Sequence, residues 1–545
     1  MLAATAMSAG AQAVPAAVTA AEQGISAERI RAHVRFLADD LLEGRYPGLR
    51  GGELAAKYIA TQFALDGLAP GGDNGTYLAQ VKFVGMKAIP EKTTYALEPK
   101  TGAAIPLTYG EDYTVSDQGL RAAADVHAPI VFVGYGVVAP EFGWNDYAGV
   151  DVKGKVVLCI VGDPPSDDPK FFGGKAMTYY GRWTYKFEEA ARQGAVGALI
   201  IHRTDLASYG WGVVQNSNTS EKTYLADDAN AKLEAASWVQ LEVAKKIFAA
   251  SGMPFDEAFA AAGKKGFKAV ELPVSLKAHV ESVVRPFESP NVVGILRGTD
   301  GGKAQAVMYT AHYDHLGFVP GMKGDNVYNG AADNGTGSGI LLEEARAWSA
   351  MAAGGGARPA HDVIFAAVTA EEQGLLGSEY LGQHPPVPGG AISLDLNYDM
   401  ILPVGVPQEI NVNGAQRTNF YPVVQTTAKE FGLTIVPDPR PEAGSYYRSD
   451  HFSLSRVGIP AFSIDTGAKW EGHDLAWGQA QEKDYNEHRY HNFSDNYTPE
   501  MNFEGNAKLA RFGMELGWRA LERKGEIEWL PGDEFEAARK RSEAQ

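Results

Sequence analysis

Four stretches between residues 307 and 400 decide the fold of this sequence: VMYTAHYDHLG (307–317), NGAADNGTGSG (329–339), DVIFAAVTAEEQGLLGSEY (362–380) and AISLDLNYDM (391–400). Apolar runs typical of buried strands alternate with Gly-rich turns and helical segments, which predicts an α/β fold with a mixed, mostly parallel sheet flanked by helices. Histidine and acidic residues stand where the apolar runs end. Open sheets of this kind bind ligands beyond the carboxyl ends of their strands, so we expect these polar residues to meet at one edge.

The residues at these strand ends have the chemistry of metal ligands. Imidazole nitrogens and carboxylate oxygens suit Zn²⁺, Mn²⁺ or Co²⁺. A site for two ions needs a carboxylate that bridges them, two further protein ligands for each ion and an open position for water. That count is met by His312, Asp333, Glu372, Asp399 and one more histidine from further along the chain.

His491 is the strongest candidate for the remaining ligand. It lies in the polar run NEHRYHNFSD (486–495), just before the last predicted core helix, where a loop can reach the edge of the sheet. The spacing alone leaves His451, His473 and His488 as alternatives.

Two further acids at the strand ends fit other roles. Adjacent side chains diverge, so Glu372 can bind metal while Glu371 acts as the general base toward water. A solvated acidic pair at the start of a helix is the alternative explanation. Asp314, two residues after His312, projects to the same side of an extended chain and can orient the imidazole, unless it is simply a surface aspartate.

The composition of the chain argues against several classes of function. The 545 residues carry a formal net charge of −18, which argues against nucleic acid or an anionic membrane as the main partner. Cys159 is the only cysteine, so no internal disulfide can form, and we expect a buried apolar residue at this position. The glycine run 335–339 lacks the spacing of a dinucleotide fingerprint.

The N-terminal segment, residues 1–24, is rich in small apolar residues. Ala11-Gln12-Ala13 is similar to a signal-peptidase site, so we expect a signal-like or disordered segment and an exported protein, periplasmic or secreted. No other stretch reaches about 18 uninterrupted apolar residues, so we expect no membrane span.

The rest of the chain divides into three parts. Residues 25–115 contain two amphipathic helices and a strand, and residues 287–545 contain the metal-site strands and a charged tail that we expect to form a solvated helix. Residues 116–286 are β-rich and interrupt this α/β pattern, which indicates an inserted domain.

Five motifs in this order, AHYDHLG, GAADNGTG, TAEEQGLLGS, LNYDM and RYHNFSDNY, resemble those of the co-catalytic di-zinc aminopeptidases. Their clan also holds glutamate carboxypeptidase II and the glutaminyl cyclases. The resemblance covers residues 25–115 and 287–525 and implies the zinc-peptidase fold. The inserted segment resembles a protease-associated domain.

The resemblance implies two Zn²⁺ per chain, a peptide substrate and a role for each site residue. Asp333 would bridge the two ions, His312 and Asp399 would complete one, and Glu372 and His491 the other. Glu371 would be the general base, Asp314 the partner of His312, and Tyr490 a donor to the developing oxyanion. In relatives the bond after the bridging aspartate is often cis, which implies a cis Asp333–Asn334 bond.

Three other functions stay open. A carboxypeptidase of the glutamate carboxypeptidase type would need a cationic pocket for the substrate carboxylate, for which Arg448 is the obvious residue near a motif. Glutaminyl cyclases use one zinc ion and usually lack the inserted domain. A non-catalytic binding protein on the same fold, like transferrin receptor, would have lost ligands or base, whereas here every position is filled.

Overall fold

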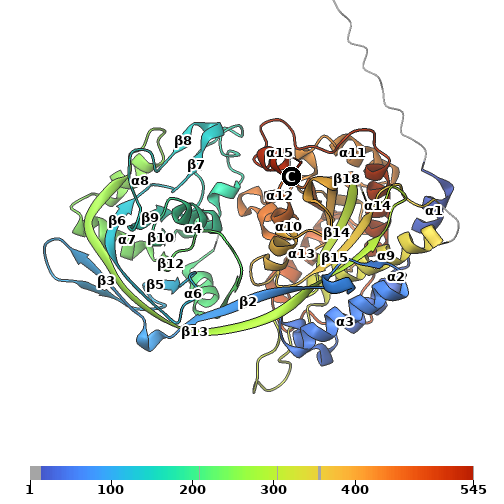
Figure 1. The fold of residues 1–545 in the computed structure, drawn as a ribbon, viewed down its shortest axis with the longest axis horizontal. Coiled ribbons are helices and arrows are strands. Elements are labelled where there is room, and N and C mark those ends of the chain that lie inside the picture. Colours follow the sequence, from blue (N-terminus) through green and yellow to red (C-terminus); the bar gives the residue numbers. More distant parts are fainter. Residues whose placement is uncertain (1–13, 208, 303–304, 354–356, 544–545) are drawn as a thin grey trace, which may run out of the picture. The chain divides into compact units, whose positions relative to one another are not determined.

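The computed structural model describes residues 14–207, 209–302, 305–353 and 357–543. These residues form two compact units, each with its own core (Figure 1). The first unit holds the described residues of Met1–Gln80, Pro290–Pro437 and Asp450–Gln545, and the second holds Val81–Ser289 and Asp438–Ser449.

The first unit is built on a mixed, mostly parallel sheet. Its strands follow the order β19 (Ala461–Ser463), β16 (Ile392–Asn397), β14 (Ala306–His312), β15 (Val363–Val368), the last residues of β13 (Val270–Leu296) and β1 (Ala69–Pro70). Strands β19, β16, β14 and β15 are parallel, and β13 pairs antiparallel with β15 and β1. The predicted fold class is confirmed.

Helices cover both faces of this sheet because its strands are apolar on both sides. In β14, Val307, Tyr309 and Ala311 contribute to the larger core, while Met308 contributes to the core on the opposite face. The larger core includes residues of α1 (Ala16–Gln23), α2 (Ala27–Leu37), α3 (Arg50–Leu65), α9 (Gly337–Ala353), α11 (Tyr421–Glu430) and α14 (Glu504–Leu521). The smaller core includes residues of α10 (Leu376–Gln383) and α12 (His451–Arg456).

The remaining elements of the first unit are peripheral. They are the small sheet of β17 (Glu409–Asn411), β18 (Thr434–Ile435) and β20 (Asp465–Thr466), and the helices α13 (Leu475–His488) and α15 (Glu536–Glu543). No helix among the described residues has the length and apolar character needed to cross a membrane.

The described residues near each end of the chain are more ordered than the sequence predicts. Residues 1–13 of the expected signal-like segment lie outside the described residues, but α1 is a packed helix with Val18 fully buried. The guanidinium of Arg511 fixes its end by donating to the carbonyls of Glu22 (3.1 Å) and Ile25 (2.8 Å). This helix has only eight residues, AAVTAAEQ, and Val18 is its one large apolar residue. So short a segment shows no helical periodicity that would predict a packed helix.

The expectation of a solvated C-terminal helix is wrong for part of α15. Ala538 and Arg539 are buried, and the Arg539 guanidinium donates to the carbonyl of Ile392 (2.8 Å). A long basic side chain can cover apolar surface with its stem and still satisfy its charged end on backbone oxygens.

The second unit contains a further group of paired strands, which continues from β13. Its strands are β3 (Thr94–Pro99), β4 (Ile105–Leu107), β5 (Tyr113–Ser116), β6 (Ala123–Phe132), β9 (Val156–Ile160), β10 (Gly197–Ile201), β12 (Ala235–Val239) and the first part of β13. The hairpin β7 (Val138–Ala139) and β8 (Trp144–Asn145) and the pair β2 (Leu78–Ala88) and β11 (Lys222–Leu225) complete the strands. The helices are α4 (Trp183–Arg192), α5 (Thr204–Ala207), α6 (Trp211–Thr219), α7 (Leu241–Ala250) and α8 (Phe255–Ala262).

The predicted insertion, residues 116–286, lies inside this unit, but the unit extends beyond it. It begins at Val81 because β3 pairs with β13 and β5 pairs with β12, pairings that sequence order does not reveal. It also includes residues 438–449. The identification as a protease-associated domain stays a prediction. Cys159 is fully buried in β9, as expected, and burial raises the pKa of its thiol to about 12.

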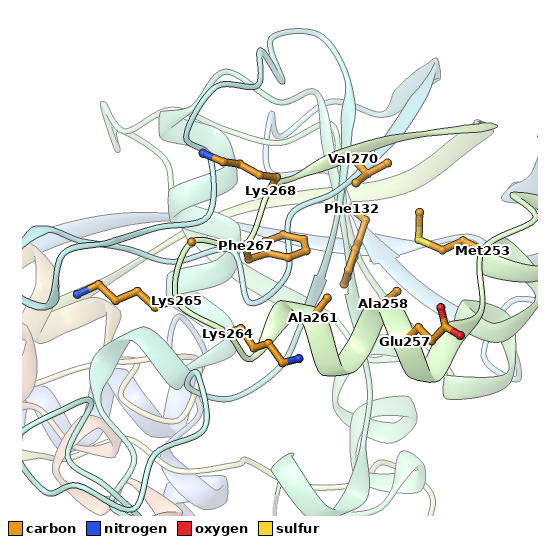
Figure 2. Close-up of a pocket in the computed structure, with 11 residues that line it drawn as sticks. Phe132, Met253, Glu257, Ala258, Ala261, Lys264, Lys265, Phe267, Lys268 and Val270 are labelled. Atoms are coloured by element: carbon orange, nitrogen blue, oxygen red, sulfur yellow. The ribbon is translucent and has the colours of Figure 1, made fainter.

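A pocket of about 450 Å³ lies in the second unit between β6 and α8 (Figure 2). Phe132, Met253 and Phe267 line it, and the amino groups of its lysines point in different directions. Its lining residues include no histidine. The predicted metal ligands are all in the first unit.

Candidate metal centre

The first group of possible ligands forms where β14 and β16 end. His312 is the last residue of β14, Asp399 follows β16, and Asp333 lies in the turn η6 (Ala331–Thr336) that leads into α9. The Nε2 atom of His312 is 3.2 Å from Asp399 Oδ1 and 3.3 Å from Asp333 Oδ1. Three donor atoms, one from the end of a strand and two from the segments around Asp333 and Asp399, therefore lie close together, with a spacing that suits one cation.

The second group lies on the other side of Asp333. His491 Nε2 is 3.3 Å from Asp333 Oδ2 and 3.0 Å from Glu372 Oε2. The two oxygens of Asp333 thus face different histidines, which is the geometry of a carboxylate shared by two cations.

His315 belongs to this second group, although it is not among the ligands predicted from the sequence. Its Nδ1 lies 2.6 Å from Glu372 Oε1, and with Asp333 and Glu372 it forms a possible ligand set of its own. Its Nε2 is buried without a hydrogen-bond partner. The spacing His312-x-x-His315 within AHYDHLG was the available signal.

The alternative histidines are elsewhere. His473 stacks on Trp477 with ring centroids 3.7 Å apart, and His488 lies near Asp484 on the surface of α13. His451 is buried in α12 and belongs to neither ligand group found among the described residues.

Glu371 and Asp314 lie against the first group. Glu371 Oε2 is 4.0 Å from His312 Nε2, and burial raises the pKa of Glu371 well above its ordinary value. The buried Asp314 carboxylate lies 3.7 Å from His312 Nδ1 and accepts the backbone N–H of Glu371 (3.1 Å) and, more weakly, that of Glu372 (3.4 Å). Asp314 therefore connects the loop after β14 to the loop after β15.

Burial and charge act against each other at His312. Burial favours its neutral form, but the carboxylates of Asp399 and Glu371 outweigh that effect and raise the pKa of His312 well above its ordinary value. Such a concentration of buried carboxylates calls for positive charge, which one or two bound cations would supply. The donor set of imidazole and carboxylate groups without thiolate fits zinc.

Asp495 holds the turn that carries Asp333. Its carboxylate accepts the backbone N–H of Ala332 (3.1 Å) and Asp333 (3.0 Å) and the hydroxyl of Tyr485 (3.1 Å). In the sequence, Asp495 is recognisable only as part of the motif RYHNFSDNY. Its role depends on a long-range contact, so spacing could not indicate it.

Asn334 connects the loops of Asp333 and Asp399. Its amide nitrogen donates to the carbonyl of Tyr398 (2.8 Å), and its amide oxygen accepts the N–H of Met400 (3.2 Å), on either side of Asp399. The Asp333–Asn334 peptide bond is cis, as the resemblance implies.

Arg45 is a buried cation behind the ligand loops. Its guanidinium donates to the backbone carbonyls of Tyr313 (2.7 Å) and Gly330 (3.0 Å) and also to those of Leu37 and Asn329. Burial lowers its pKa to about 10, so it stays charged at neutral pH. One side chain therefore fixes the loops on both sides of the site.

Tyr490 lies beside His491, and its ring stacks on the imidazole with centroids 3.9 Å apart. The side chain is 45% exposed. This stacking explains a tyrosine at the position, and the oxyanion role stays a prediction.

The fold and the site together have the form of a metal-dependent hydrolase of the α/β class, with its ligands at the carboxyl ends of parallel strands. Residues 291–510 match the model of Peptidase family M28. That segment contains all five predicted ligands, from His312 to His491. The resemblance that the motifs indicate is confirmed.

Curated proteins with similar sequences are named as aminopeptidases. The chain is 28% identical over 186 residues to aminopeptidase YwaD of Bacillus subtilis (strain 168), which covers 33% of this chain and 36% of that protein. It is 29% identical over 239 residues to a probable leucine aminopeptidase of Trichophyton verrucosum (strain HKI 0517), covering 43% and 54%. The matched part is thus about a third to a half of these relatives.

A solved aminopeptidase from Aneurinibacillus sp. strain AM-1 has a similar structure, with a TM-score of 0.50 and 18% identity. The match covers 95% of this chain and 98% of that chain. At this identity the likeness shows the fold alone.

Proposed function

We propose that this chain is a zinc-dependent aminopeptidase that removes N-terminal residues from peptides at a centre of two zinc ions. The observation that carries the proposal is the position of Asp333, with one oxygen facing His312 and the other facing His491. Relatives named as aminopeptidases support the choice of substrate.

We assign His312, Asp333 and Asp399 to one zinc ion and Asp333, Glu372 and His491 to the other. His491 is preferred over His315 because the two imidazoles face different oxygens of Glu372. His491 lies near Oε2, while His315 Nδ1 hydrogen-bonds Oε1 and can orient the carboxylate from behind.

Zinc bound here would lower the pKa of a water molecule and polarise the carbonyl of the scissile bond. Glu371 then takes the proton from the attacking water and delivers it to the leaving amine, a role that suits a buried carboxyl with a raised pKa. Asp314 holds Glu371 in place through its backbone N–H. Tyr490 would donate a hydrogen bond to the oxyanion as it forms.

The substrate's free α-ammonium group fits a site lined by buried carboxylates, which gives selectivity for N-termini. Export to the periplasm or beyond remains part of the proposal and depends on Ala11-Gln12-Ala13, which lies outside the described residues.

The test compares a leucyl peptide that has a free amine with the same peptide N-acetylated, each with metal-replete and chelator-treated protein. We expect cleavage only of the free-amine peptide, loss of cleavage on chelation, and recovery with zinc. Equal or preferred cleavage of the acetylated peptide would refute the aminopeptidase assignment and favour a carboxypeptidase. Zinc binding without turnover of either peptide would favour a binding protein.

A further inference from the structure

The pocket between β6 and α8 lies wholly within the second unit and shares no residue with the candidate metal centre (Figure 2). Its volume of about 450 Å³ is in the range of sites that bind small organic molecules. Most of its lining is apolar, namely Phe132, Met253, Ala258, Ala261, Phe267 and Val270. Several of these side chains are only half-buried, so the pocket leaves apolar surface uncovered.

The space is left by small residues on one face of α8. Ala258 and Ala261 are three positions apart on the helix, so both can face the pocket. Across from them Phe132 is buried in β6, and its ring meets that of Phe267 edge-on with centroids 5.6 Å apart. Because alanine is small, room for an apolar group remains between the helix and this aromatic pair.

The turn after α8 gives one end of the pocket a positive charge. The backbone N–H of Phe267 donates to the carbonyl of Lys264 (3.1 Å), and Gly266 adopts the positive φ of 86° that the turn requires. The turn places Lys264 and Lys265 next to Phe267, and Lys268 follows directly. Three cations therefore line the pocket within five residues.

The charge of these lysines is not neutralised by the protein. Lys264, Lys265 and Lys268 are exposed, and among the described residues none of them pairs with a carboxylate. Lys265 donates to the carbonyl of Phe142 (3.1 Å), a contact that keeps its charge. Figure 2 shows the lysines on one side of the pocket and Glu257, its one acidic lining residue, on the other. In a chain with a net charge of −18, such a local excess of positive charge favours an anionic ligand.

We propose that this pocket binds a small organic anion that has an apolar body and one carboxylate. The apolar body lies between Phe132 and Ala261, and the carboxylate faces the lysines at the rim. Burial of the apolar part supplies most of the binding free energy, and the lysines select the charge. The ligand can be a free carboxylic acid or the C-terminal residue of a peptide. The proposed peptide hydrolysis takes place elsewhere, at the metal centre.

The test uses two acids and their amides. The probes are 4-phenylbutyrate, which is a free acid, and acetyl-Ala-Phe, which is a peptide with a blocked amine. Each is compared with its amide, which has the same apolar group without the charge. Binding to the zinc-loaded full chain is measured by isothermal titration calorimetry.

One pair of variants tests the apolar part of the pocket. A261F fills the pocket, and because Ala261 is exposed the larger side chain should leave the core intact. The control is A260F, at an exposed position of the same helix that does not line the pocket. We expect A261F to lose binding of the acids and A260F to keep the affinity of the intact protein. Equal binding by the two variants would overturn the proposal, because the acids would then bind elsewhere.

A second pair of variants tests the charge. K264Q/K268Q removes two exposed lysines from the rim, and K100Q/K153Q removes two exposed lysines elsewhere in the same unit. The intact protein should bind at least one acid about fivefold more tightly than its amide, which identifies the source of the carboxylate. K264Q/K268Q should lose this preference, whereas K100Q/K153Q should keep it.

The preference for the acid decides the outcome. If neither acid binds, or if K264Q/K268Q and K100Q/K153Q show the same preference, the proposal is wrong. Hydrolysis of a leucyl peptide does not enter this test, so the proposed function is tested separately.

Discussion

Glu371 and Glu372 are neighbours in the chain, but their side chains have different surroundings. Glu372 lies between His315 and His491, whereas Glu371 lies nearer His312 and has a raised pKa because it is buried. This difference supports a role for Glu372 as a metal ligand and for Glu371 as the general base.

Replacing Glu371 with glutamine should therefore remove the base and keep the metal. We expect kcat on a leucyl peptide to fall by about 10²–10⁴-fold, the usual contribution of a general base. The zinc content measured by mass spectrometry should stay at the value of the unmodified chain. E482Q, an exposed position on α13, serves as the control. Full activity in E371Q would exclude the role, and loss of zinc would make Glu371 a ligand.

At the residue scale, the sequence predicted which polar side chains at strand ends come together. Both the end of a strand and the polar residue that follows it are local features of the sequence. His312, Asp333, Glu372 and Asp399 meet as expected. His315 was missed although it lies in the same motif. Asp495 and Arg45 act through contacts with residues far along the chain, which local patterns do not record.

At the element scale, Arg45 ties the turn η1 (Asp40–Arg45) to the loops that carry ligands. It donates to carbonyls at Leu37, Tyr313, Asn329 and Gly330, and each would lose a donor if the side chain were apolar. The hydrogen bonds of Arg45 therefore connect the N-terminal helices to the edge of the sheet that carries the ligands.

The substitution R45M should lower the free energy of unfolding by about 3 kcal/mol or more, since each buried acceptor left unpaired costs about 1–3 kcal/mol. Zinc affinity should weaken about 10–100-fold, as for other residues that support ligands. Urea unfolding and a competitive zinc chelator measure the two effects. R50M, on the exposed start of α3, should change neither. Unchanged zinc affinity in R45M would show that Arg45 supports the fold without shaping the site.

Helices and strands with strong periodicity were predicted well, as α2, α3 and the strands β14, β15 and β16 show. The sequence did not predict the packing of α1 and α15, because only a few residues of each helix are buried. In α1 Val18 provides the apolar anchor, and in α15 buried Arg539 satisfies its charge on the Ile392 carbonyl.

At the scale of the whole molecule, the chain passes between its two units more often than composition suggests. The sequence pattern becomes β-rich near residue 116, which indicates the start of the insertion. The unit itself starts at Val81 and also includes residues 438–449. Those twelve residues are separated from the rest of their unit by some 150 positions, so only a structure assigns them.

Counting the bound zinc tests whether two zinc ions share Asp333. Purified protein is loaded with zinc, passed through a desalting column and analysed by inductively coupled plasma mass spectrometry. We expect two zinc ions per chain, one in H491A and two in H315A, and we expect D333N to lose affinity for both. A single zinc ion in the unmodified chain, or two in D333N with unchanged affinity, would contradict this expectation.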